Sequence, residues 1–202
     1  IVGAIPLMVV SDYLTEIAEV TLQRVQSSAW RDLHKKYGRP GDLGDMDTGF
    51  AVIGYGKLGG IELGYASDLD LVFLHGSANF NAVTDGRRSV ANDVFYARMG
   101  QRVIHMLTTR TPSGLLYEAD MRLRPNGNSG QLVASLNTFE KYQLSDAWTW
   151  EHQALVRARA VAGDPVVTAR FAALRHRILC LERDPEKLLT DVVGMRQKMR
   201  AS

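Results

Sequence analysis

Two aspartates separated by one leucine are the residues best placed to do chemistry in this sequence. Asp68 and Asp70 stand at the start of an apolar run that extends to Leu74. In an extended strand alternate side chains share a face, so both carboxylates point the same way, with backbones about 6.6–6.8 Å apart. Carboxylates in that arrangement can jointly hold two divalent ions about 3.5–4 Å apart, the spacing used in two-metal phosphoryl transfer.

An isolated Asp-x-Asp pattern is common, and in most proteins it marks a solvated strand end or turn. Two features favour a functional site here. Unpaired carboxylates would be costly to bury in the apolar run, and the pair follows a loop, residues 54–64, that contains five glycines. Glycines let a backbone come close to a polyphosphate and donate N–H groups to it. The candidate phosphate-binding residues around this loop are Lys57, Gly59, Gly60 and Ser67.

A third carboxylate is expected from residues 115–123, which read as another strand. Because neighbouring strands lie about 4.8 Å apart, Asp120 can complete a metal cluster with the first two acids. By alternation Arg122 and Arg124 would face the same cleft and neutralise triphosphate charge. Glu118 shares that face and is the weakest candidate. The alternative is a ladder of salt bridges on a solvated face.

The glycine loop also matches two other nucleotide-binding patterns in part. A dinucleotide-binding fingerprint would need a helix that opens at its third glycine and packs along the sheet. Residues 60–67 are too few and too glycine-rich for such a crossover helix. A P-loop would need Gly-Lys followed by Ser or Thr after its second glycine, which Gly59-Gly60-Ile61 does not supply. Both patterns are therefore rejected.

Predicted strands and helices must place these side chains together. Buried strands are expected at residues 50–53 and 69–74, where the sequence is continuously apolar or nearly so. A helix capped by Ser11 should extend to about residue 36, and another is expected over residues 90–107. The apolar face of the first helix is predicted to carry Leu14, Ile17, Ala18 and Leu22.

The C-terminal part is expected to be helical. Ser135 should begin a short helix, and residues 147–161 a longer one. Asp164-Pro165 and Asp184-Pro185 then repeat one signal, an N-cap aspartate with proline at the first helical position, which predicts two further helices.

An aromatic cluster of Trp148, Trp150 and His152 lies in the longer predicted helix. On a helix Trp148, His152 and Leu155 would lie on one side. Packing of the aromatic side chains into the core is favoured over adenine stacking or protein docking. Surface or packing positions are predicted for the two arginines that follow, Arg157 and Arg159, although this helix could also approach the site.

Composition narrows the class of protein. Of the 202 residues, 46% are apolar and 23% charged, as in ordinary soluble globular proteins. A net charge of +2, without a basic patch interleaved with aromatic residues, argues against nucleic acid. No run approaches the roughly 18 apolar residues of a membrane span, and no signal peptide is evident. The lone Cys180 is expected to be a buried, reduced thiol, so we predict a cytoplasmic protein.

Residues 54–71, taken together, closely resemble the nucleotide-binding motif of the glutamine synthetase adenylyltransferases, which belong to the nucleotidyltransferase superfamily. Residues 120–125 and 147–159 resemble further segments of that family, so the similarity covers nearly the whole chain. The resemblance implies a small mixed-sheet fold with flanking helices and a C-terminal helical extension. It also implies transfer of AMP from ATP to a tyrosine hydroxyl of glutamine synthetase, with Mg²⁺, as two ions, on Asp68, Asp70 and Asp120.

Enzymes of that family carry two related nucleotidyltransferase domains in one chain. The N-terminal domain removes AMP from glutamine synthetase by phosphorolysis, and the C-terminal domain adds it. Gly64-Tyr65 and Leu69 resemble the C-terminal copy, because the other copy tends to have Asn-Phe and Ile at these positions. The resemblance further implies control by glutamine and by a PII-type signal protein.

Three segments follow from this interpretation. Residues 1–44 would be a helical lead-in, residues 45–135 the nucleotidyltransferase core, and residues 136–202 a helical segment continuing into a truncated helical domain. Both ends are expected to be cut, since the chain starts at Ile1 and its last residues still read as helix.

Three other functions remain open from the sequence. The same acids could catalyse phosphorolysis of an adenylylated protein, and dependence on phosphate would distinguish that activity. A non-catalytic nucleotide or effector sensor would bind ATP without turnover. An RNA-directed nucleotidyltransferase would bind RNA in a salt-sensitive way, and the near-neutral charge disfavours it.

Overall fold

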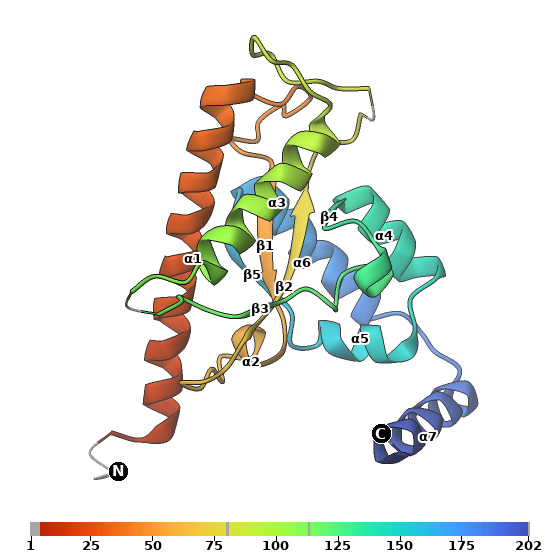
Figure 1. Cartoon of the computed structure of the whole chain (residues 1–202). Coiled ribbons are helices and arrows are strands. Elements are labelled where there is room, and N and C mark those ends of the chain that lie inside the picture. The colour runs from red at the N-terminus through yellow and green to blue at the C-terminus, as the bar shows by residue number, and fades with distance from the viewer. Residues whose placement is uncertain (1–4, 80, 113, 202) are drawn as a thin grey trace.

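A mixed five-stranded sheet forms the centre of the computed structural model (Figure 1). The structure describes residues 5–79, 81–112 and 114–201. In chain order the strands are β1 (Phe50–Gly54), β2 (Leu69–His75), β3 (Ala119–Asp120), β4 (Val133–Ser135) and β5 (Arg159–Gly163). β2 pairs antiparallel with β1 on one edge, and in parallel with β3 and then β4 on the other. β1 also pairs antiparallel with β5. The predicted mixed α/β fold class is confirmed.

Helices lie on both faces of this sheet. Figure 1 shows α3 in front of it and α6 behind, with α1 along one side and α7 apart from the sheet. α1 packs on α3, and α5 contacts α7. The helices are α1 (Leu7–Tyr37), α2 (Gly56–Gly59), α3 (Asn92–Thr108), α4 (Leu136–Ser145), α5 (Thr149–Leu155), α6 (Pro165–Leu179) and α7 (Pro185–Ala201), with a 3₁₀ turn, η1 (Gly127–Ser129).

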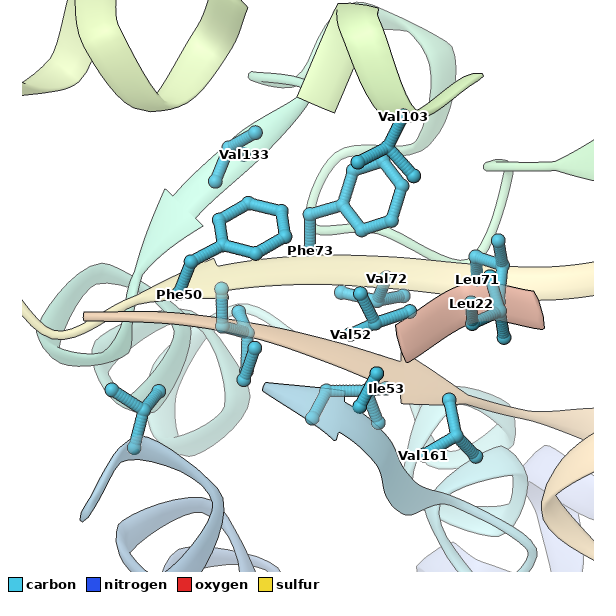
Figure 2. Packing of buried hydrophobic residues seen from close by; sticks show 14 of the residues in the cluster. Leu22, Phe50, Val52, Ile53, Leu71, Val72, Phe73, Val103, Val133 and Val161 are labelled. Atoms are coloured by element: carbon cyan, nitrogen blue, oxygen red, sulfur yellow. The ribbon is translucent and has the colours of Figure 1, made fainter. Parts of the chain in front are cut away.

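β1 and β2 are buried on both faces, which explains their continuous apolar sequences. Every residue of β1 is buried, and in β2 only Asp70 is partly exposed. The ring centroids of Phe50 and Phe73 lie 5.5 Å apart, and Figure 2 shows both rings on the side of the sheet where Val103 of α3 lies. Burial of each such side chain contributes roughly 1.5–3 kcal/mol. The two strands predicted at residues 50–53 and 69–74 are therefore confirmed, each one residue longer.

The predicted first helix is confirmed, but its start and its buried face differ from the prediction. α1 begins at Leu7, after Pro6, so Ser11 lies inside the helix rather than at its N-cap. Ala18 and Leu22 are fully buried as predicted, whereas Ile17 is exposed. The buried face of α1 includes Thr15 instead. Positions 15, 18, 22 and 25 lie on the side of the helix that packs on α3 and the sheet.

Three predicted helix starts have the expected caps. The Ser135 hydroxyl accepts a hydrogen bond from the Thr138 amide at 3.0 Å. The Asp164 carboxylate accepts one from the Val166 amide at 2.9 Å, and Asp184 does the same for the Glu186 amide at 2.9 Å. These bonds satisfy backbone donors that a helix leaves free at its first turn.

The long helix predicted over residues 147–161 is wrong in its second half. α5 ends at Leu155, and the chain then enters β5 as an edge strand against β1. The run of small and charged residues here is compatible with a helix. The pairing of residues 159–163 with β1 is a non-local interaction, so the local sequence pattern does not reveal it. This pairing overrides the helix propensity of the segment.

Two burial predictions are also wrong. Trp148 and Trp150 are exposed and line a groove of about 630 Å³ between α5 and α7, while Leu155 of the same segment is buried. Cys180 follows the end of α6 and is exposed rather than buried. Within the described parts of the chain, no helix combines the length and apolarity that crossing a membrane requires.

The four-residue helix α2 packs tightly against the chain that enters β5. A Cβ atom at Gly59 would clash with the backbone carbonyl of Arg157, and one at Gly60 would lie 2.8 Å from the Nε of the same arginine. Arg159 then donates hydrogen bonds to the carbonyls of Leu58 and Gly59. Glycine at position 59 is thus a packing requirement of the fold.

Gly59→Ala should therefore destabilise the protein by about 2 kcal/mol, the usual cost of forcing extra volume into a packed contact. This corresponds to a fall in melting temperature of roughly 5 °C for a domain of this size. Gly64→Ala is the matched control, since among the described residues the one atom within 4 Å of a Cβ there would be the Ser67 hydroxyl oxygen, at 3.3 Å. Thermal unfolding of both variants checks the prediction, and equal melting temperatures would contradict it.

His75 is buried at the end of β2, where its ring stacks on Tyr96 with centroids 4.5 Å apart. Among the residues that the structure describes, no group forms a hydrogen bond with its Nδ1. Asp93 lies 3.6 Å from Nε2, too far for a hydrogen bond. Burial lowers the pKa of His75 to about 4, although the charge of Asp93 opposes this shift. The folded protein therefore holds this ring neutral.

This burial predicts a loss of stability on acidification. An unfolded histidine takes up its proton near pH 6.5, so between pH 6.5 and 4 the unfolded state binds more protons than the folded state. The free energy of unfolding should fall by about 3 kcal/mol as pH drops through that window. His75→Phe, which keeps the stacked ring, should remove this part of the pH dependence in urea titrations. An unchanged pH profile in the variant would contradict the assignment.

Candidate active site

Parallel pairing of β2 with β3 brings two of the predicted acids together. Asp70 stands opposite Asp120 in the register, and the Leu69 amide donates to the Glu118 carbonyl at 2.9 Å. Asp68 directly precedes β2. The hydrogen bonds between two segments far apart in sequence thus place the three carboxylates at one end of the sheet.

The carboxylates lie within electrostatic reach of one another. The pKa of Asp70 is raised, first by partial burial and then by the charges of Asp68 and Asp120. Arg122 and Lys57 act in the opposite direction. Negative charge at Asp70 is therefore only partly compensated, a condition that a bound cation would relieve.

Asp120 is held by an arginine two residues away. Its Oδ1 accepts from the Arg122 backbone amide at 2.8 Å and its Oδ2 from the Arg122 Nε at 2.7 Å, and the two side chains also form an ion pair through Nη2. The side chain of Asp120 is 14% exposed and that of Arg122 75%. The hydrogen bond from Arg122 is the main reason why the pKa of Asp120 is lowered.

The strand predicted over residues 115–123 is wrong except at its centre. β3 contains two residues, because the chain turns at Met121, whose carbonyl accepts from the Arg124 amide. Arg122 and Arg124 therefore do not continue a strand face. Arg124 instead donates to the carbonyls of Met121, Asn128 and Gly130, and so holds the turn that follows the site.

The glycine loop meets the acids through Gly56. This residue has φ +54° and directly abuts Asp70, whose carboxylate would clash with any Cβ atom there. The Tyr55 amide donates to the Asp70 carbonyl at 2.9 Å and fixes the loop against β2. The predicted site residues do not include Gly56. The sequence feature that could have identified Gly56 is its position two residues after the end of a buried strand.

The remaining predicted phosphate ligands lie along the same loop. Lys57 is exposed on α2, and its charge acts on Asp70. The Ser67 hydroxyl accepts from the Gly64 amide at 3.1 Å and closes the turn before Asp68. α2 has only four residues and β1 is antiparallel to β2. The rejection of a dinucleotide-binding crossover is therefore confirmed.

The donor set suits Mg²⁺, although the acids are not gathered into a metal cage in this conformation. Across the described residues, His, Cys, Asp and Glu side chains nowhere form a group of three or more that could hold a metal ion. Hard carboxylate oxygens are the ligands that Mg²⁺ prefers. The pKa of Asp70 is raised by burial and then by its two acidic neighbours, and Arg122 and Lys57 offset this only in part. Both oxygens of Asp120 accept hydrogen bonds from Arg122, so we expect Asp120 to give up part of this bonding when it becomes a ligand.

Comparisons with known proteins indicate the family of this chain. A family model described as glutamate-ammonia ligase adenylyltransferase matches residues 1–174. Three similar proteins bear the name bifunctional glutamine synthetase adenylyltransferase/adenylyl-removing enzyme. They come from Hahella chejuensis (60% identical over 200 residues), Thioalkalivibrio sulfidiphilus (58% over 202) and Methylococcus capsulatus (54% over 203).

These matches cover 98–99% of this chain and 21% of each relative, so the chain spans about a fifth of their length. The resemblance seen in residues 54–71 and 120–125 is confirmed by the family model, which includes both segments. The chain belongs to the glutamate-ammonia ligase adenylyltransferase family.

Proposed function

We propose that this chain is a metal-dependent adenylylating domain that moves AMP from ATP to a tyrosine hydroxyl of glutamine synthetase. The observation that carries the proposal is the register of β2 and β3, which sets Asp70 opposite Asp120 beside Asp68. Three acids on two neighbouring strands, next to a glycine loop, are the donor set that phosphoryl transfer with two Mg²⁺ ions requires. The names of the relatives supply the transferred group and the protein substrate.

Asp68, Asp70 and Asp120 would hold Mg²⁺. When bound, the ions would neutralise triphosphate charge and favour the ionised tyrosine. Lys57, Gly60 and Ser67 would line the phosphate side of the site beside Gly59, whose own face packs on the Arg157 carbonyl. Arg124 would keep the turn after Asp120 in place. Arg122, whose side chain is 75% exposed while it pairs with Asp120, would be free to approach a phosphate oxygen once released from that pair.

The reaction itself needs little from the chain beyond positioning and proton transfer. The tyrosine oxygen attacks the α-phosphorus in line, the bond to the bridging oxygen breaks, and pyrophosphate leaves. The proton of the hydroxyl goes to a carboxylate, for which Asp120 is our candidate because its register with Asp70 places it at the proposed metal site.

Adenylylation is favoured over phosphorolysis by Gly64-Tyr65 and Leu69, which resemble the adenylylating copy of the family. The relatives' name includes an adenylyl-removing activity, so the reverse-type reaction is the second candidate. Control by glutamine and a PII-type signal protein, and a second nucleotidyltransferase domain in the same protein, rest on the family resemblance. A cytoplasmic location rests on the sequence alone.

Asp70→Asn should lower AMP transfer by a hundredfold or more, because a metal-binding charge worth several kcal/mol is lost. Its melting temperature should be unchanged or slightly higher, since burial and carboxylate repulsion already raise the pKa of Asp70. Transfer is measured as label from α-phosphate-labelled ATP on glutamine synthetase. Asp45→Asn, in the exposed loop before β1, is the control with the same chemical change. A wild-type rate in Asp70→Asn would refute the metal assignment.

The direction of the reaction is tested in the same assay. Adenylylated glutamine synthetase with phosphate in place of ATP should release no ADP. Release of ADP, together with no labelling of the unmodified synthetase, would show that the domain works by phosphorolysis.

A further inference from the structure

Arg157 lies at the other end of α2 from Asp70. Gly56, at the start of α2, abuts the Asp70 carboxylate, while the Arg157 guanidinium lies against Gly60, directly after its end. One helical turn rises about 5.4 Å. The guanidinium is therefore about one turn along α2 from the carboxylate, on the loop proposed to hold phosphates.

The guanidinium of Arg157 is weakly engaged. Within the part of the chain that the structure describes, its one partner is the Glu62 carboxylate. The side chains of Arg157 and Glu62 are 44% and 61% exposed. Exposed ion pairs of this kind contribute little to stability, because water solvates both charges nearly as well.

The other arginines around the site make more hydrogen bonds and ion pairs than Arg157 does. Arg159 is half-buried, donates to the Leu58 and Gly59 carbonyls, and pairs with Glu19. Arg124 serves three carbonyls of the turn after β3. Arg122 is bound to Asp120 by two hydrogen bonds and an ion pair. Arg157 thus places the planar donor group of its guanidinium close to the glycine pair Gly59-Gly60. Of these arginines, it would lose the fewest interactions by binding a different partner.

We propose that Arg157 binds the β- and γ-phosphates of ATP, and that Glu62 holds it when no nucleotide is bound. Phosphate oxygens replace the Glu62 carboxylate as acceptors, without any movement of the Arg157 backbone, which packs on Gly59. This assignment rests on the proposed function, and it makes Glu62 a competitor of the substrate. Arg157 then becomes a nucleotide-binding residue rather than the surface or packing residue that its sequence position predicts.

The test is the affinity for ATP and for AMP, each with Mg²⁺ and without glutamine synthetase, measured by calorimetry. Arg157→Ala should weaken ATP binding about tenfold or more, the loss expected for a charge-assisted bond to phosphate, and AMP binding less than threefold. Glu62→Gln should tighten ATP binding about two- to fivefold by removing the competing carboxylate. Arg102→Ala is the matched control, because Arg102 and Asp32 form a surface ion pair with side chains 43% and 51% exposed.

The outcomes separate this inference from the proposed function. Unchanged ATP affinity in Arg157→Ala, while the wild type still binds ATP and transfers AMP, overturns the role of Arg157 alone. Weaker ATP binding in Glu62→Gln, with a fall in melting temperature, means that the pair is structural and also overturns it. A wild-type protein that binds no ATP with Mg²⁺ removes the basis of both.

Discussion

The whole site depends on how the first two residues of β2 are hydrogen-bonded. Helices cover both faces of β2 and β1 fills one edge, so the other edge must also find backbone partners. β3 supplies them at the start of the strand and β4 at its end. The two residues of β3 are enough to hold Asp120 beside Asp70. The rest of β2 is apolar and buried in the core, which fixes the position of Asp70.

Charge around the acids is organised as pairs that a ligand can exchange. Asp120 is satisfied by Arg122, and Glu62 by Arg157, at opposite sides of the glycine loop. Asp70 forms no such ion pair with any residue that the structure describes, and it lies against Gly56 with its pKa raised. A metal–nucleotide complex carries both signs of charge, so it can take the carboxylate from one pair and the arginine from the other. In this conformation the outer charged groups of the site are therefore paired, while the charge of Asp70 is only partly compensated by Arg122 and Lys57.

The sequence was sufficient for the parts of the molecule that local pattern determines. Continuous apolar runs locate β1 and β2, and aspartate–proline pairs locate the starts of α6 and α7. The acid pattern names Asp68, Asp70 and Asp120 as candidates, and the register of β2 and β3 brings Asp70 and Asp120 together. β5 was not predictable in this way, because its strand state arises only from pairing with β1. The turn at Met121 escaped prediction for a related reason: alternation continues through Arg124, while the side chain of Arg124 binds the carbonyls of a turn.

The roles of Gly56 and Arg157 depend on contacts that no spacing rule reveals. Gly56 is required by a carboxylate on the next strand, and Arg157 reaches Gly60 across nearly a hundred residues of sequence. The glycine pair looked like a phosphate cradle. In the fold, Gly59 is needed first for the close approach of the chain that enters β5, and only its neighbour Gly60 faces a guanidinium.

The most direct measurement is a crystal structure of the chain with Mg²⁺ and a non-hydrolysable ATP analogue. We expect the carboxylate of Asp120 to leave Arg122 and to join Asp68 and Asp70 on the bound metal. Metal and nucleotide bound elsewhere, or an Asp120 that stays on Arg122 while Mg²⁺ occupies the site, would contradict it.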